Sequence, residues 1–170
     1  MRYLVLAATL ALAACGSKSE TEIASGTVTD PETGETTEYS VTSTGEGDEG
    51  QVNIRTKDGE MSFGATAEAK LPDGFTPYPG AKMLGGVTTS GKQGAGGMAS
   101  FEVKGKASDV IAHFRKQAEA QGLEITGEVS MGDMQSFGAE KPGDDKTGVH
   151  VTATQNGDMV TGSFTYGLGG

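Results

Sequence analysis

Three neighbouring side chains carry the groups that nucleophilic catalysis uses: the hydroxyl of Ser108, the carboxylate of Asp109 and the imidazole of His113. A hydrolase triad combines such groups as nucleophile, orienting acid and base. Here Ser108 directly precedes an amphipathic run, where serine is a preferred helix N-cap. Asp109 then suits the helix dipole in the first turn and forms an i,i+4 pair with His113. With no supported nucleophile–base pair, we expect no enzymatic activity.

Residues 86–93, with the sequence GVTTSGKQ, come close to a phosphate-binding P-loop. That motif needs a serine or threonine after its lysine to bind magnesium, and here Gln93 follows Lys92. It also needs a helix N-terminus behind the loop, whereas more glycine follows in this chain. We therefore interpret the segment as a strand entering a flexible hairpin loop and expect no nucleotide cofactor.

Metal sites are also disfavoured by the spacing of the ligand-type residues. The acidic segment Gly45–Gly50 and the pair Asp144-Asp145 lack the regular ligand positions of a calcium loop. The two histidines, His113 and His150, are far apart, and the chain has one cysteine, so a zinc site is improbable. We interpret the acidic segments as solvated turns and expect no metal and no cofactor.

The cysteine, Cys15, lies at the end of a secretory signal pattern. Arg2 precedes an apolar run over residues 3–11, and small residues lead to Cys15. The apolar stretch is about a dozen residues, whereas a bilayer-spanning helix needs about 20. A plain secretory signal is one interpretation, but it leaves Cys15 without a role.

The residues Leu12-Ala13-Ala14-Cys15 resemble the lipobox of bacterial lipoproteins. This resemblance implies cleavage before Cys15 and acylation of both its sulfur and its new amine. Several acyl chains give stable membrane anchoring, which one chain does not. Gly16 and Ser17 follow, with no aspartate that would retain the protein in an inner membrane. The resemblance therefore implies a lipid-anchored protein on the periplasmic face of the outer membrane.

The composition excludes several classes of partner and bounds the size of the core. The net charge of −10 and pI of about 4.6 disfavour nucleic acid and anionic lipid as partners, which leaves the acyl chains on Cys15 as the membrane contact. Hydrophobic residues make up 35% and aromatic residues 6%, with 28 glycines, so we expect short strands, many turns and a modest core. One cysteine allows no intrachain disulfide.

Changes in pattern divide the chain into a signal peptide (1–14), a lipidated tether (15–25), an acidic β-hairpin region (26–70) and an α+β domain (71–170). Turn signals at 30–34 and 57–60 predict two hairpins forming a small sheet in the acidic region. The acidic region has few apolar residues for an independent fold, so disorder is the alternative. That set is Val41, Val52, Ile54, Met61 and Phe63.

After a boundary rich in proline and glycine at 71–80, the pattern predicts a helix over 109–121, with Gly122 at the C′ position. Its apolar face has helical spacing, and Asn156-Gly157 is a hairpin turn signal. The expected strands are 81–89 and 99–104, around a glycine-rich loop at 90–97, then 123–130, 134–140, 149–155 and 159–166. The order β-β-α-β-β-β-β predicts an α+β fold with one helix packed on an antiparallel sheet.

Residues 75–82 (FTPYPGAK), the helix start at 108–114 and the Gly122-Leu123 step together resemble a recurrent module of bacterial envelope lipoproteins, recognised by a YPGAK-type segment. The resemblance covers about 71–166 and implies this α+β fold, with no assigned activity. Members often carry a bulky aromatic residue where this chain has Leu123, a departure that affects packing.

These observations predict a non-enzymatic structural or interaction module of the cell envelope, which presents a sheet surface or edge to an envelope protein or cell-wall polymer. Phe75 and Tyr78 are the candidate contact residues, or alternatively plug one end of the sheet. A competing hypothesis is a carrier of a small hydrophobic ligand, bound in a pocket between helix and sheet. The expected lining of that pocket is Phe101, Val103, Ile111 and Phe114.

Overall fold

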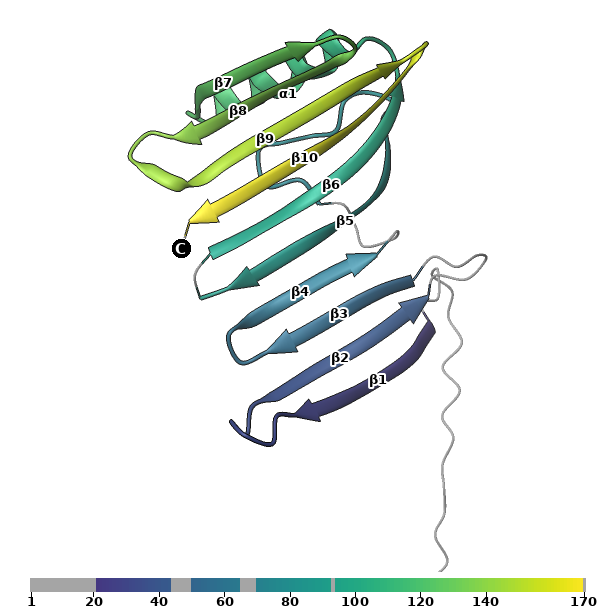
Figure 1. Cartoon of the computed structure of the whole chain (residues 1–170), viewed down its shortest axis with the longest axis vertical. Helices are drawn as coiled ribbons and strands as arrows, with labels where there is room; N and C mark the ends of the chain where they lie inside the picture. Colours follow the sequence, from purple (N-terminus) through teal and green to yellow (C-terminus); the bar gives the residue numbers. More distant parts are fainter. Residues whose placement is uncertain (1–20, 44–49, 65–69, 93, 170) are drawn as a thin grey trace, which may run out of the picture.

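The computed structural model describes residues 21–43, 50–64, 70–92 and 94–169. In these ranges the chain forms a ten-stranded antiparallel sheet with one α-helix on one of its faces (Figure 1). This confirms the α+β class, with one helix on an antiparallel sheet. Cys15, the predicted signal peptide and most of the acidic segment 45–50 lie outside the described residues.

The sheet has the strand order β1-β2-β3-β4-β5-β6-β10-β9-β8-β7. Neighbouring strands are linked mostly by hairpins, and one crossover through the helix places β7 at the far edge, with β10 beside β6. The strands are β1 (Thr21–Thr29), β2 (Thr36–Ser43), β3 (Gly50–Thr56), β4 (Gly59–Gly64), β5 (Lys82–Gly91), β6 (Gly94–Lys104), β7 (Glu124–Met131), β8 (Met134–Lys141), β9 (Asp144–Asn156) and β10 (Met159–Gly169).

The hairpin detail of the N-terminal half differs from the predicted small sheet of two hairpins. Strand β4 pairs with β5 from Gly59↔Gly91 to Gly64↔Gly86, so β1–β4 continue the main sheet edge to edge. The predicted loop at 90–97 is also wrong, because most of it belongs to the ends of β5 and β6. Its glycines permit close strand contact: a Cβ on Gly91 would lie 2.5 Å from the carbonyl oxygen of Asp58.

Helix α1 (Ala107–Ala120) packs against β7, β8 and β9 and lies behind the sheet in Figure 1. It ends in a Schellman motif: Gly122 has φ +76° and donates its N–H to the carbonyl of Glu119, and Leu123 donates to Ala118. The predicted C′ role of Gly122 is confirmed. The motif supplies hydrogen-bond donors to carbonyl groups that would otherwise lack a partner at the end of the helix.

The helix begins earlier than predicted, and Ser108 is not its N-cap. The N-cap is Lys106, which makes no side-chain capping bond. The side chain of Gln155 on β9 instead accepts the N–H of Ala107 at 2.7 Å. Ser108 therefore lies inside the first turn, where its hydroxyl is 3.3 Å from a carboxylate oxygen of Asp109.

One hydrophobic core fills the space between the helix and the strands around it. Its largest fully buried side chains come from β6, α1, β8, β9 and β10: Phe101, Val110, Phe114, Phe137, Val151, Val160 and Phe164. In contrast, no described side chain of β1–β4 is buried. Packing therefore concentrates at one end of the sheet, and the N-terminal strands extend from it as a single layer (Figure 1).

Candidate functional site

The strands near the helix carry their apolar side chains on the face that the helix covers, whereas β1–β4 carry theirs on the opposite face. Residues paired across antiparallel strands share a face, and the register Val41↔Val52↔Phe63↔Val87↔Met98 runs across five strands. Ala99, the neighbour of Met98, is buried, as is Phe101 in the core under the helix. Since side chains alternate along a strand, the row ending at Met98 lies on the face away from the helix.

A bulge in β5 places apolar side chains of this strand on both faces of the sheet. Met83 pairs with Phe101 and packs against the core, whereas Gly85 pairs with Ser100. The extra residue between them, Leu84, shifts the alternation by one position. Met83 and Val87 would share a face in a regular strand, and the bulge places them on opposite faces.

The apolar residues away from the helix form a continuous uncovered surface, which we call the open face. Its members are Val28, Tyr39, Val41, Val52, Ile54, Met61, Phe63, Val87 and Met98. Val28 is 59% exposed, and Met61 and Met98 are each 42% exposed. In the described part of the chain, no helix and no second sheet covers these strands. An uncovered apolar surface spanning several strands is typical of an interaction site.

The opposite face of the same strands is polar. Asn53 accepts hydrogen bonds from Ser62 at 2.6 Å and Gln51 at 2.9 Å, and Arg55 forms an ion pair with Glu60 at 3.2 Å. A shallow hollow of about 310 Å³ lies over this face and is lined mainly by such polar groups. The N-terminal strands are therefore amphipathic, with polar groups satisfied on one face and apolar groups uncovered on the other.

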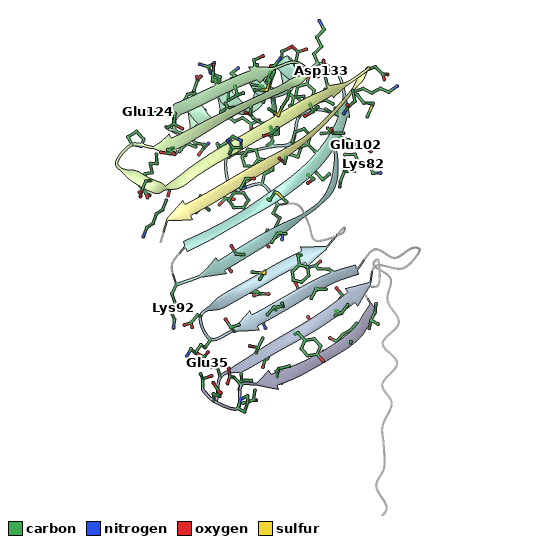
Figure 2. The ribbon with its side chains drawn as sticks, viewed as in Figure 1. Glu35, Lys82, Lys92, Glu102, Glu124 and Asp133 are labelled. Carbon is green, nitrogen blue, oxygen red and sulfur yellow. The ribbon has the colours of Figure 1, made fainter. Side chains whose placement is uncertain are left out.

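Charged residues lie at the ends of these strands, where they join successive turns. Glu35 before β2 forms an ion pair with Lys57 in the β3–β4 turn, and Asp58 of that turn forms one with Lys92 after β5 at 3.0 Å. The hydrogen bond that Lys57 donates to the carboxylate of Glu35 raises the pKa of Lys57 above its usual value. Figure 2 shows Glu35 and Lys92 along the same side of the sheet, where the strands meet their turns. These pairs keep charge at the rim of the open face.

Both edges of the sheet carry features that discourage strand addition. The edge strand β1 has an irregularity between Glu22 and Ala24, and the edge strand β7 has one between Ile125 and Gly127. The exposed Glu128 adds charge to β7. Bulges and charges at sheet edges prevent pairing with another strand. Of the two surfaces that the sequence suggested for a partner, the face is better suited than the edge.

The residues considered for catalysis have structural contacts. The Nε2 atom of His113 is 3.1 Å from the carbonyl oxygen of Thr76 and 2.7 Å from the side-chain nitrogen of Gln117. Gln117 also accepts the N–H of Thr76 at 2.8 Å. These contacts replace the predicted pairing of His113 with Asp109. They fasten the segment at 71–80 to the helix, and sequence alone gave no sign of the long-range partner.

Phe75 and Tyr78, the predicted contact residues, pack against the domain. The Phe75 ring lies 4.9 Å from that of Phe164, edge to face, and the Tyr78 ring lies 5.3 Å from that of His113. Both are half-buried against the core. Their contact with a partner stays a prediction, and the residues of the open face are the ones that the sequence analysis did not single out for binding.

Most of the P-loop-like segment and the whole Asp144-Asp145 pair lie in regular strands. Residues 86–91 of the P-loop-like segment belong to β5, which turns directly into β6 and not into a helix. Asp144 accepts hydrogen bonds from Thr147 and from the backbone of Lys146, which lower its pKa. Among the described residues, no group of three His, Cys, Asp or Glu side chains is placed to hold a metal ion.

The space between helix and sheet is largely filled. Phe101, Val103 and Phe114, from the predicted pocket lining, are buried, and the rings of Phe101 and Phe114 lie 5.7 Å apart. A cavity of about 200 Å³ lies at the end of this layer, and its apolar wall includes Phe75, Leu123, Val149 and Leu168. The available volume is therefore at the C-terminal end of the helix.

Comparison with known proteins gave one match. A family model described as START domain-like matches residues 84–160, slightly under half of the chain. The matched part holds β6, α1, β7, β8 and β9 in full and most of β5, but none of β1–β4. Searches of curated proteins and of solved structures found no match. Within the described residues, no helix has the length and apolar character needed to cross a membrane.

Proposed function

We propose that this protein is a non-enzymatic interaction module of the bacterial cell envelope, anchored by lipid at Cys15, which binds a partner through its open face. The observation that carries the proposal is the uncovered apolar surface on β1–β6. A sheet that is apolar on one face normally buries that face against a second layer. Since the described chain supplies no such layer, a partner is the natural source of it.

The position of the open face fits an anchored protein. Cys15 lies six residues before Thr21, where β1 begins. An extended chain spans at most about 3.6 Å per residue, so β1 begins within roughly 20 Å of an acyl anchor at Cys15. The anchor would thus hold the open face close to the envelope components that share the membrane surface.

The anchor is tested by replacing Cys15 with serine. We expect Cys15→Ser to leave the fold unchanged and to move the protein from the membrane fraction to the soluble fraction of cells. Circular dichroism of the purified variant checks the fold. Retention of the variant in the membrane fraction would contradict the anchor and leave the proposal for the open face standing.

The open face is tested by photocrosslinking in cells from two adjacent positions. A photoreactive residue at Met61 lies on the open face, and the same residue at Ser62 lies on the polar face. We expect a discrete adduct from Met61 and none from Ser62, since the two positions differ in face and hardly in location. Equal labelling from both positions, or none from Met61, would overturn the proposal.

A second candidate function is transport of a small hydrophobic ligand. START domain-like folds often bind hydrophobic ligands, and the cavity beside Leu123 and Leu168 has an apolar wall. Its 200 Å³ is below the roughly 300–1,000 Å³ of common ligand pockets, so only a small ligand would fit. A carrier should bind an apolar fluorescent dye in a way that Leu168→Arg abolishes and Met61→Arg does not. The reverse pattern would favour the open face.

A further inference from the structure

The open face is suited to a surface of the same chemistry. Over β1–β5, its central rows hold Val, Ile, Tyr, Met and Phe side chains with no charged residue among them. The Lys82–Glu102 ion pair lies on the same side but at the ends of β5 and β6, as Figure 2 shows. A charged partner surface would lose its hydration there without gaining a counter-charge. The partner must therefore be apolar and nearly uncharged itself.

A second copy of this chain meets that requirement. A two-fold dimer brings the same patch of each subunit together, so the patch must be self-complementary. An uncharged apolar face satisfies this condition, because no like charges meet across the axis. Tyr39, Met61, Phe63 and Met98 provide the aromatic and methionine side chains that are enriched at interface centres.

The area is also sufficient. Five strand spacings of about 4.8 Å and about six residues at about 3.3 Å give a face of roughly 500 Å² per copy, before the relief of the side chains is counted. Two copies thus reach about 1,000 Å², the lower bound for a specific interface. The bulges in the edge strands β1 and β7 disfavour strand addition, so association through the face is favoured over association through an edge.

We propose that two copies of this protein pack open face to open face, forming a β-sandwich in which each supplies the layer that the other lacks. The proposal rests on the proposed function, since it names the partner of that surface. Sheets in such sandwiches lie about 10 Å apart with strands about 30° from parallel. The polar faces of β1–β4 and the two helices then lie on the outside.

Sedimentation of the full-length chain carrying Cys15→Ser tests the proposal. We expect a dimer, which Met61→Asp weakens by at least ~100-fold because an unpaired charge is buried once in each subunit. The matched control Ser62→Asp places the same charge on the polar face and should leave the dimer unchanged. Met61 is 42% exposed in one chain, so its aspartate variant can fold as a monomer, which circular dichroism checks.

Several outcomes would overturn the dimer. One is a monomer at about 100 μM, a concentration well above the Kd of most specific dimers; another is a dimer that Met61→Asp leaves intact. If the monomer gives a Met61 adduct with a different protein in cells, the dimer fails and the proposed function stands. If monomers bind neutral phosphatidylcholine vesicles in a way that Met61→Asp alone abolishes, the occupant is a lipid surface and the dimer again fails. Absence of both self-association and Met61 adducts removes both proposals.

Discussion

Gln155 is the polar side chain that joins the start of the helix to the last hairpin. Its Oε1 atom accepts the N–H of Ala107 at 2.7 Å. Its Nε2 atom is 2.9 Å from the carbonyl oxygens of both Gly105 and Gly157, and 3.3 Å from that of Met159. One amide group thus satisfies the first N–H of the helix, which the N-cap residue Lys106 leaves unbonded, and bridges the carbonyl groups around the turn between β9 and β10.

The change Gln155→Met keeps the length of the side chain and removes all of these bonds. Loss of the acceptor at the start of the helix costs about 1 kcal/mol. The bonds to the carbonyl groups of Gly105 and Met159 are partly buried, and each of these groups costs about 1 kcal/mol more when it loses its donor. We therefore expect the free energy of unfolding to fall by about 2–3 kcal/mol. For a chain of this size that lowers Tm by roughly 4–12 °C.

Ser108→Ala is the matched control, because serine at that position is the N-cap that the sequence predicts. Among the residues that the structure describes, its hydroxyl bonds to Asp109 alone, at 3.3 Å, and alanine is the better helix former, so we expect a change below about 0.5 kcal/mol. Urea unfolding followed by circular dichroism measures both variants, and an unchanged m-value confirms that the same surface unfolds. A larger loss for Ser108→Ala than for Gln155→Met would refute the capping argument.

Two further predictions concern strand contact and acid stability. A Cβ on Gly162 would lie 2.4 Å from the carbonyl oxygen of Thr152, so Gly162→Ala should lower stability by about 1–3 kcal/mol in urea unfolding. Gly127→Ala, where a Cβ meets nothing within 4 Å, should change it little, and equal losses would contradict the reasoning. Backbone N–H groups of the following turn lower the pKa of Asp30, and the hydroxyl of Thr147 lowers that of Asp144, below the usual 3.8. Each carboxylate thus stabilises the fold above pH 3.8 and loses that contribution as the pH falls through its folded pKa. A midpoint at or above 3.8 in an NMR titration of either carboxyl group would refute the lowered pKa.

Local patterns predicted much of the fold. The periodicity of Val110, Phe114 and Ala118 located the helix, and all three are buried. The hairpin turns at 57–58 and after Asn156 also appear where the turn residues predict them. Each of these features is determined by residues within about one turn of helix or one hairpin, which is the range over which sequence spacing is informative.

The features that the sequence patterns did not predict depend on contacts between residues far apart in the chain. The cap of the helix comes from Gln155, 48 residues after Ala107. The open face depends on the register from β4 to β6 and on the bulge after Met83, neither of which the alternation within one strand reveals. Val52 and Ile54 are recognisable from the sequence as one face of a strand, but not as a face that points away from the helix.

The division of apolar residues between two faces has a consequence for stability. The strands around α1 bury a complete core, whereas the described side chains of β1–β4 are at most half-buried. Burial of apolar surface is the dominant stabilising contribution, at roughly 25 cal/mol per Å². Within the described chain, the N-terminal strands therefore depend more on backbone pairing and on the ion pairs at their turns than on burial. The apolar row from Val41 to Met98 lies on a side of the sheet that the helix does not reach. A second layer on that face would bury this row, so it would contribute to folding and to binding by the same physical effect.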